Sequence, residues 1–175
     1  MKKLSFKTAL GGMITALCLI LMFSVGIFPV LVYAFPMLSS LLIYVLSYEC
    51  GNSTALASYI SVSLLSLILS PDKESALIFL AFFGYYPIIN GYIERLKSKL
   101  VQWVIRFAIF NAAMVVSYFV LIKLFTAVSL NEFGEFTVPI LLGMGNLILI
   151  CYDIALHNVS RVYVRKLRYI IFKRK

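Results

Sequence analysis

The stretch TALGGMITALCLILMFSVGIFPVLVYAFPMLSSLLIYVLSY, from Thr8 to Tyr48, contains 41 residues and no charge. A membrane-spanning helix needs about 20 predominantly apolar residues. The stretch is twice that length, and the sequence Gly26–Pro29 offers a break near its middle, because proline and glycine interrupt helices. We therefore expect one span near residues 7–25 and a second near residues 29–48.

The composition of the whole chain indicates a membrane protein. Hydrophobic residues make up 62% of the sequence and charged residues 13%, with a mean hydropathy of +0.99. Soluble domains are about half apolar and about a quarter charged. A small soluble protein could not hide so much apolar surface, because its surface is large relative to its volume. A lipid bilayer solves this problem by acting as the solvent for the outer face.

Four further apolar runs follow, each bounded by charges or turn residues. They lie near residues 53–70, 75–93, 100–125 and 137–158. Beyond them, the basic tail 159–175 interleaves apolar with basic residues, as in a helix lying on an anionic membrane surface. The prediction is an all-α integral membrane protein with a single membrane domain, residues 1–175, folded as a bundle of six transmembrane helices.

The basic residues orient these spans. With the N-terminus inside, the inner segments carry 13 of the 16 basic residues, whereas the outer segments carry Lys73 and Lys123. Cytoplasmic loops of membrane proteins are enriched in Lys and Arg. We expect a multi-pass protein of the cell membrane with both termini in the cytoplasm. The basic clusters flank apolar spans and lack a basic-aromatic motif, so no nucleic-acid partner is expected.

Two charged residues fall within the predicted spans. Arg106 and Asp153 each lie about two turns from the inner end of their span, roughly 8–10 Å from the interface. Charges inside a membrane are costly and usually pair with one another. We predict a structural ion pair between Arg106 and Asp153, with Glu94 or His157 sharing the network. A gating role is the alternative.

A second group of polar residues lies deeper in the spans or toward the outer side. One interpretation is helix packing, because small residues let helices approach closely and amides bond across them. The other is a ligand cavity between the spans at 75–93, 100–125 and 137–158, roofed by the polar loop at 129–136. Both interpretations stay open. The candidate ligand-binding residues are Tyr85, Tyr86, Asn111, Tyr118, Lys123, Asn131, Glu132 and Asn146.

Motifs for catalysis and metal binding are missing from the sequence. There is no phosphate-binding G-x-x-x-x-G-K-[ST] loop, no H-E-x-x-H pair and no G-x-S-x-G nucleophile turn. One histidine and three scattered cysteines do not provide a zinc site. We therefore expect neither an enzyme nor a metal or cofactor site.

The first span carries small residues on one face. Thr8, Gly12 and Ala16 recur every four residues, and Ala9 widens the patch. Ridges of this kind allow another helix to pack closely. These four residues are candidates for partner docking, and the partner is either another protein or another span of this chain.

Several of these features together resemble a known family. The length, six spans, inner termini, short basic N-terminus and early small-residue ridge resemble the substrate-binding S component of an energy-coupling factor (ECF) transporter. The resemblance covers the whole chain in architecture, and its specific part is KTALGGMITAL, residues 7–17. Members of that family often carry Ala-x-x-x-Ala there. In this chain Ala9 is followed four residues later by Met13, and Gly12 by Ala16.

The resemblance implies a function in nutrient uptake. The protein would bind a small nutrient, typically a vitamin, near the outer face and would not hydrolyse ATP itself. A coupling transmembrane subunit and a pair of ATPases would be its partners within the lipid bilayer. The small-residue ridge would dock on the coupling subunit. The sequence carries no vitamin-specific signature that identifies the ligand.

Two other classes remain open. One is a six-span scaffold or assembly protein, similar to the rod-shape-determining MreD-like proteins, which uses its spans and basic tail to hold partner proteins. The other is a small stand-alone transporter, exporter or channel. A bound small molecule favours the S component, association with cell-wall machinery favours the scaffold, and conduction by the protein alone favours the channel.

Overall fold

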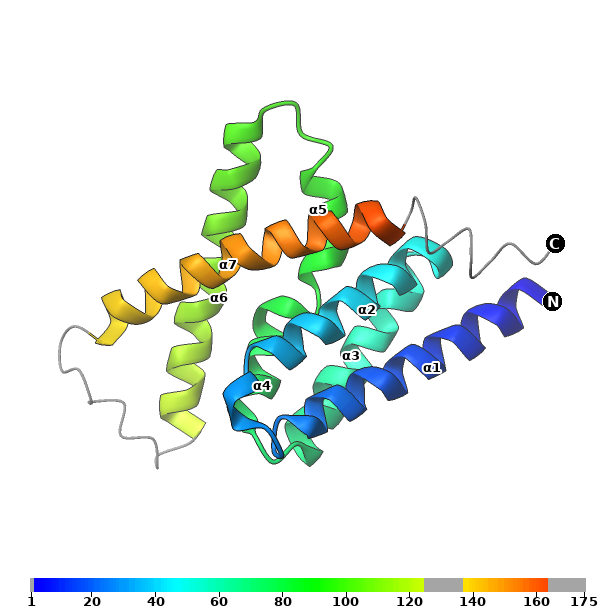
Figure 1. Ribbon diagram of the computed structural model, residues 1–175, viewed down its shortest axis with the longest axis horizontal. Coiled ribbons are helices and arrows are strands. Elements are labelled where there is room, and N and C mark those ends of the chain that lie inside the picture. Colours follow the sequence, from blue (N-terminus) through cyan, green and yellow to red (C-terminus); the bar gives the residue numbers. More distant parts are fainter. Residues whose placement is uncertain (1, 125–136, 164–175) are drawn as a thin grey trace.

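The computed structural model describes residues 2–124 and 137–163, and its helices are labelled in Figure 1. In chain order the elements are α1 (Lys2–Ser24), the 3-10 helix η1 (Pro29–Leu31), α2 (Ala34–Cys50), α3 (Asn52–Leu69), α4 (Lys73–Ile78), the π-helical segment η2 (Phe79–Phe83), α5 (Tyr86–Ile93), α6 (Lys99–Leu124) and α7 (Thr137–Val162). No strand occurs in these two ranges.

The helices have the length and composition of membrane spans. Within the described ranges, five segments are long and apolar enough to cross a membrane, and α2 is a shorter apolar helix of 17 residues. Many large apolar side chains are exposed along them, such as Ile20 of α1 and Ile68 of α3. Exposed apolar surface of this kind suits a lipid solvent. The described part of the chain is thus all-helical and compatible with an all-α membrane bundle.

Helices α1, α2 and α3 run side by side and form one layer of the molecule (Figure 1). Their shared core contains Cys18, Met22, Ile43 and Leu46, all essentially inaccessible. Small polar side chains line the same contacts, and the buried Ser39 hydroxyl donates to the Cys18 carbonyl at 3.5 Å. Small residues permit close helix packing in membranes, so serines substitute here for larger apolar residues.

The second helix begins later than the sequence predicts. The chain turns at 25–28, forms η1, and enters α2 only at Ala34, five residues after the expected start near residue 29. Proline at residue 29 has no amide hydrogen and a fixed φ, which suits a helix start but not a helix interior. Gly26 is required in this turn, because a Cβ there would overlap the ring of Pro71 in the α3–α4 connection.

The fourth apolar segment, expected as one span at 75–93, is long and apolar enough over Lys73–Ile93 to cross a membrane, but it is not a regular α-helix throughout. It contains α4, η2, a turn and α5. In η2 the amide of Gly84 donates to the Phe79 carbonyl at 2.8 Å, a spacing of five residues. Pro87 then follows in the first turn of α5. Extra-residue turns and prolines redirect helices, so α5 leaves at a different angle from α4 (Figure 1).

Tyr59 of α3 supports this broken segment from the side. Its hydroxyl donates to the Leu80 carbonyl at 2.7 Å, and its ring occupies the space where a side chain at Gly84 would lie. Backbone groups released from the regular helical pattern inside a membrane need such partners. The irregular backbone is therefore held by protein contacts rather than exposed to lipid.

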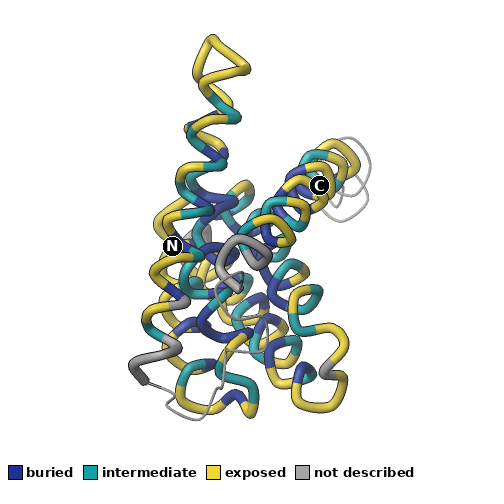
Figure 2. Tube along the Cα trace, turned by 90° about the vertical axis from the view of Figure 1, so that its left-hand side faces the viewer, coloured by how far each residue is buried: buried dark blue, intermediate teal, exposed yellow. Residues whose placement is uncertain are grey.

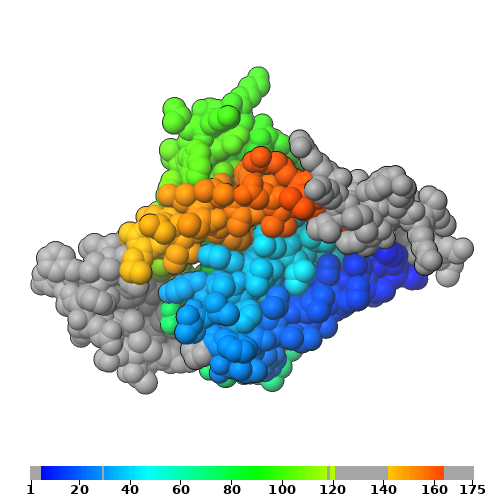
Figure 3. Space-filling view, in the orientation of Figure 1, coloured from blue at the N-terminus to red at the C-terminus, as the bar shows by residue number. Residues whose placement is uncertain are grey.

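Helix α7 lies across α6 and against α2 (Figures 1 and 3). The α5–α6 turn projects away from the α1–α3 layer, and Figure 2 shows its tip to be exposed. The start of α1, the α2–α3 turn and the end of α7 lie toward one end of the molecule in Figure 1, whereas the α1–α2 and α3–α4 connections lie at the other. Aromatic residues from four elements, Phe82, Phe83, Tyr86, Phe110 and Tyr152, fill the space between these helices.

Candidate functional site

The centre of the polar site is an ion pair between α6 and α7. Nη1 of Arg106 lies 2.7 Å from Oδ2 of Asp153, and the two side chains are only 4% and 5% exposed. Both residues are therefore removed from solvent at the crossing of the two helices. This is the pairing that the sequence predicts from their equal depth. The other carboxylate oxygen of Asp153, Oδ1, accepts a hydrogen bond of 2.8 Å from the hydroxyl of the fully buried Tyr86 on α5.

Glu94 and His157 extend this network toward the α5–α6 turn. Oε1 of Glu94 lies 3.3 Å from Nε2 of His157 and 3.9 Å from Nη2 of Arg106. The Asn90 side-chain amide also donates to this oxygen at 2.9 Å. Both residues named in the sequence prediction thus contact the network. Glu94 is 46% exposed, so the network runs from a buried pair to a half-exposed carboxylate.

The network gives α5, α6 and α7 a fixed register. Burying two charges is expensive, but each here has a charged partner, and Asp153 also accepts a hydrogen bond from Tyr86. Removing one partner of a buried pair typically costs about 3–5 kcal/mol, because the other charge is left uncompensated. Two buried polar atoms in this region nevertheless lack a hydrogen-bond partner within the described ranges: Nε of Arg106 and Oδ1 of Asn90.

A second polar connection joins α7 to α2. The hydroxyls of Tyr152 and Ser40, both buried, are hydrogen-bonded to each other. Tyr152 also lies against Phe83 and Tyr86, with ring centroids 4.9 and 5.4 Å away. The pairing of Ser40 with Tyr152 was not predicted from the sequence. The sequence shows only a serine and a tyrosine within apolar runs, a pattern that many other residues of this chain share.

The two amides predicted to be ligand-binding contact each other. Nδ2 of Asn111 donates to Oδ1 of Asn146 at 3.2 Å, and the reverse contact measures 3.4 Å. Asn111 also donates to the Phe107 carbonyl of its own helix at 2.8 Å. Close packing around Gly145 brings α6 and α7 together here, because a Cβ on Gly145 would lie 3.1 Å from atoms of Phe110 and Met114. This geometry corresponds to the helix-packing interpretation.

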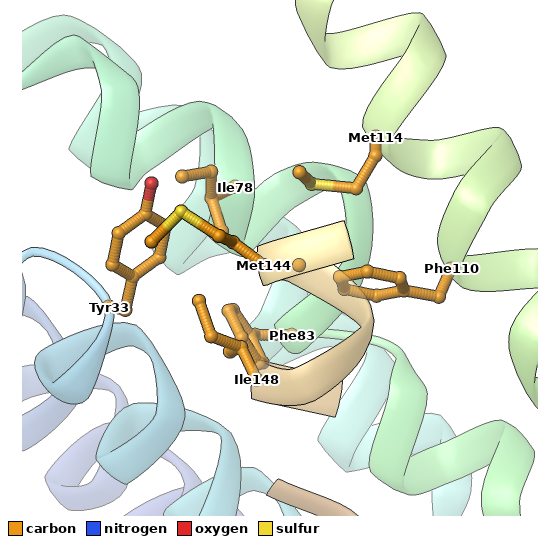
Figure 4. A pocket seen from close by; sticks show the side chains of 8 residues that line it. Tyr33, Ile78, Phe83, Phe110, Met114, Met144 and Ile148 are labelled. Atoms are coloured by element: carbon orange, nitrogen blue, oxygen red, sulfur yellow. The ribbon is translucent and has the colours of Figure 1, made fainter. Parts of the chain in front are cut away.

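A small apolar pocket lies beside this amide pair. Figure 4 shows side chains from α4, η2, α6 and α7 converging on it, together with Tyr33 from the loop before α2. Its volume is about 80 Å³, and its lining residues are Tyr33, Ile78, Phe83, Phe110, Met114, Met144, Gly145 and Ile148. The pocket is located between the three predicted spans. The four candidate ligand-binding residues whose side chains are described, Tyr85, Tyr86, Asn111 and Asn146, do not line it.

The four candidate ligand residues whose side chains are described do not form one common site. Tyr86 points to Asp153, whereas the ring of Tyr85 packs edge-on against Tyr59 of α3, with centroids 6.1 Å apart. Tyr118 and Lys123 belong to α6, but their side chains lie outside the described part. Asn131 and Glu132 lie outside the described residues, as does most of the basic tail 159–175.

Tyr33 links the mouth of the pocket to a charged residue. Its hydroxyl donates to Oε1 of Glu74 at 3.3 Å. Burial and the nearby Glu74 carboxylate together raise the pKa of Tyr33 to about 12. Both causes disfavour a phenolate, so Tyr33 stays neutral at physiological pH and offers a hydroxyl at the edge of an otherwise apolar pocket.

The small-residue ridge of α1 lies on an exposed face of the helix in the described part of the chain. Thr8, Ala9, Gly12 and Ala16 are all exposed, and a Cβ on Gly12 would meet no atom within 4 Å. The neighbouring Gly11 instead faces α3, where a Cβ would lie 3.3 Å from Cγ2 of Thr54. Another span of this chain therefore does not cover the ridge within the described ranges.

No metal-binding group of three or more His, Cys, Asp or Glu residues occurs in the described part of the chain. The site is thus a buried ion pair with hydrogen-bonded extensions, an amide pair, a small apolar pocket and an exposed small-residue helix face. No protein-family model, curated protein or solved structure matches this chain.

Proposed function

We propose that this protein is the substrate-binding membrane subunit of an ECF-type nutrient uptake transporter, located in the cell membrane with both termini in the cytoplasm. The observation that carries the proposal is the exposed ridge of Ala9, Gly12 and Ala16 on α1. A helix of a coupling subunit docks there, and a pair of ATPases bound to that subunit supplies the energy.

The ridge suits a helix partner because of its shape. In lipid there is little hydrophobic drive for helices to associate, so close van der Waals contact between small residues matters. Gly11 already uses this close approach to pack on α3. Gly12 and Ala16 present the same smooth surface outward, flanked by the exposed Met13 and Ile20.

The pocket between α4, η2, α6 and α7 is the cargo site in this proposal. Its lining is apolar apart from the Tyr33 hydroxyl, which favours a cargo with an apolar ring or chain and a single polar group nearby. Binding pockets for drug-sized ligands measure about 300–1,000 Å³. At about 80 Å³ the pocket holds only a few atoms, so loading requires α6 and α7 to separate around Gly145.

A second candidate function is favoured by that same small volume. A six-span scaffold needs docking faces but no cargo pocket, and the ridge of α1 serves it equally well. The two functions differ in what purifies with the protein. A scaffold holds partner proteins and no small molecule.

The proposed function is tested by purifying the full chain in mild detergent from its native membrane. Mass spectrometry then identifies the associated proteins and, after denaturation, any released small molecule. The proposal predicts an ATPase pair, a coupling membrane subunit and a retained small molecule. Cell-wall assembly proteins without a small molecule would instead establish the scaffold. Conduction by the reconstituted chain alone would contradict both functions.

A further inference from the structure

A wedge-shaped groove opens between α6 and α7 on the side of the ion pair that faces the α5–α6 turn. The groove has a volume of about 280 Å³ and is lined by Lys99, Gln102, Trp103, Arg106, Asp153, Ile154, His157, Asn158 and Arg161. The first turns of α6 form one wall and the last turns of α7 form the other, because the two helices diverge from their crossing (Figure 1).

Positive charge in this groove is only partly compensated. At its apex, Arg106 is neutralised by Asp153 at 2.7 Å. Nε2 of His157 lies 3.3 Å from Oε1 of Glu94, a residue that does not line the groove. Lys99 and Arg161, one on each wall, have no ion-pair partner within residues 2–124 and 137–163. Two basic side chains on opposite walls therefore remain available to an anion placed between them.

The apex also contains an unused donor. Arg106 is only 3% exposed, and its buried Nε lacks a hydrogen-bond partner among the described residues. A buried donor without a partner is costly, and charge-assisted bonds from guanidinium groups to phosphate are strong. The Arg106 guanidinium is also held against Trp103, 5.7 Å from the ring centre. Arg106 also lines the groove, so a bound anion lies close to its guanidinium group.

The rim of the groove is apolar. Leu100 and Val104 on α6 are 79% and 66% exposed, and Ile154 on α7 is 54% exposed. Charged side chains without a charged partner are costly in the hydrocarbon, so Lys99 and Arg161 mark the level of the lipid headgroups. Tryptophan is enriched at that level, where its ring is apolar and its N–H is polar. A ligand with a phosphate and adjoining acyl chains matches these surroundings better than a free phosphate does.

We propose that this groove binds the phosphate headgroup of an anionic phospholipid of the inner leaflet, with Lys99 and Arg161 contacting the phosphate and Arg106 lining the apex. Basic pockets between membrane helices on the cytoplasmic side are suited to such headgroups. The acyl chains lie along Leu100, Val104 and Ile154. The lipid wedges between the diverging ends of α6 and α7 and so stabilises their separation. This inference does not depend on the transport proposal.

Trp103 is the only tryptophan of the chain and lines the groove, so its fluorescence reports occupancy directly. The full chain is reconstituted in bilayers of phosphatidylcholine that contain either brominated phosphatidylglycerol or brominated phosphatidylcholine. Bromine quenches tryptophan on contact. We expect the brominated anionic lipid to quench Trp103 at much lower mole fraction. Equal quenching by the two lipids would overturn the proposal without any variant being needed.

The double variant Lys99→Gln/Arg161→Gln tests the two walls. Each basic residue near an anionic headgroup contributes about 1 kcal/mol, so the preference for anionic lipid should fall roughly tenfold to thirtyfold. The control is Lys7→Gln/Lys97→Gln, which removes two exposed charges outside the groove and should leave the preference unchanged. Equal losses in both variants would attribute the preference to net charge and overturn the site.

Inorganic phosphate separates a lipid from a soluble ligand. Titration of phosphate into the reconstituted protein should leave the quenching by brominated phosphatidylglycerol unchanged, because the acyl chains contribute to binding. Relief of the quenching by phosphate alone would show that the groove binds a soluble phosphate compound. That result would overturn the assignment to a lipid headgroup.

Discussion

Arg106 of α6 and Asp153 of α7 are 47 residues apart in the chain, yet their side chains meet at 2.7 Å in the interior of the protein. Tyr86 of α5 bonds to the remaining carboxylate oxygen at 2.8 Å. One aspartate therefore connects three helices. We interpret the pair as structural, since both charges are buried and paired, and the register of α6 against α7 depends on them.

Charge reversal tests this interpretation. Arg106→Asp or Asp153→Arg alone places two like charges in contact inside the protein, and each should prevent recovery of folded, monodisperse protein in detergent. The double reversal restores opposite charges at the same positions. We expect it to recover folded protein in part, as measured by the yield and elution profile in size-exclusion chromatography. Recovery remains partial because Tyr86 then faces an arginine in place of its acceptor.

Normal folding of either single reversal would contradict a structural pair. Folding of such a variant would mean that two like charges at positions 106 and 153 are tolerated, which requires both side chains to reach water. A double reversal no better than the singles would show that the surrounding groups, such as Glu94 at 3.9 Å from Arg106, fix the signs of the charges.

Removal of the Tyr86 hydroxyl tests the third helix of the network. Tyr86→Phe keeps the buried ring and deletes the hydrogen bond to Asp153. Hydrogen bonds to charged groups contribute about 1.5–3 kcal/mol, so the thermal unfolding midpoint in detergent should fall. Tyr85→Phe is the matched control, because the Tyr85 ring packs against Tyr59 on the other side of α5. Equal midpoints for the two variants would refute a role for the Tyr86 hydroxyl.

The chain could be divided into spans from its sequence because charges and turn residues bound each apolar run. The pairing of Arg106 with Asp153 was also predictable, since two charges at equal depth on consecutive spans leave few other partners. The break at 79–85 was not predicted, although Gly84 and Pro87 are residues that interrupt helices. In the structure it coincides with a tertiary contact, in which Tyr59 occupies the space beside Gly84.

The candidate ligand residues show the limit of sequence reasoning more clearly. Asn111 and Asn146 were grouped correctly in space, but they bond to each other rather than line a cavity. Tyr85 and Tyr86 are adjacent in the chain and therefore point in different directions on a helix, one toward α3 and one toward α7. The pocket is lined by apolar side chains, which no polar-residue pattern can identify.

Substitution at Gly84 tests the origin of the break. Gly84→Ala should destabilise the protein by about 1–3 kcal/mol through overpacking, because the Tyr59 ring is fixed by its bond to the Leu80 carbonyl. Gly91→Ala, in α5 with open space around it, should be neutral or stabilising, since alanine favours helix. Thermal unfolding measures both. A Gly84→Ala protein as stable as wild type would show that Tyr59 moves freely.

Gly145 offers the test of the cargo pocket. Gly145→Leu places a side chain among Phe110, Met114 and the pocket, which should fill it and abolish retention of any small molecule. Gly143→Leu adds the same side chain in open space, next to the lining residue Met144. This variant should retain the small molecule as the wild type does. The amount of small molecule released per protein is measured by mass spectrometry. Loss in both variants, or in neither, would place the cargo elsewhere.

The proposed docking face on α1 is tested most directly by photo-crosslinking in the native membrane. A photoreactive phenylalanine analogue replaces Met13, an exposed residue beside Gly12, and in a control protein it replaces Ile68, an exposed residue of α3. We expect the Met13 position to crosslink to one membrane protein, the coupling subunit of an ATPase pair. The Ile68 position should not, and Gly12→Leu should abolish the crosslink. Crosslinks from both positions only to lipid, or a Met13 crosslink to cell-wall machinery, would contradict the transport function.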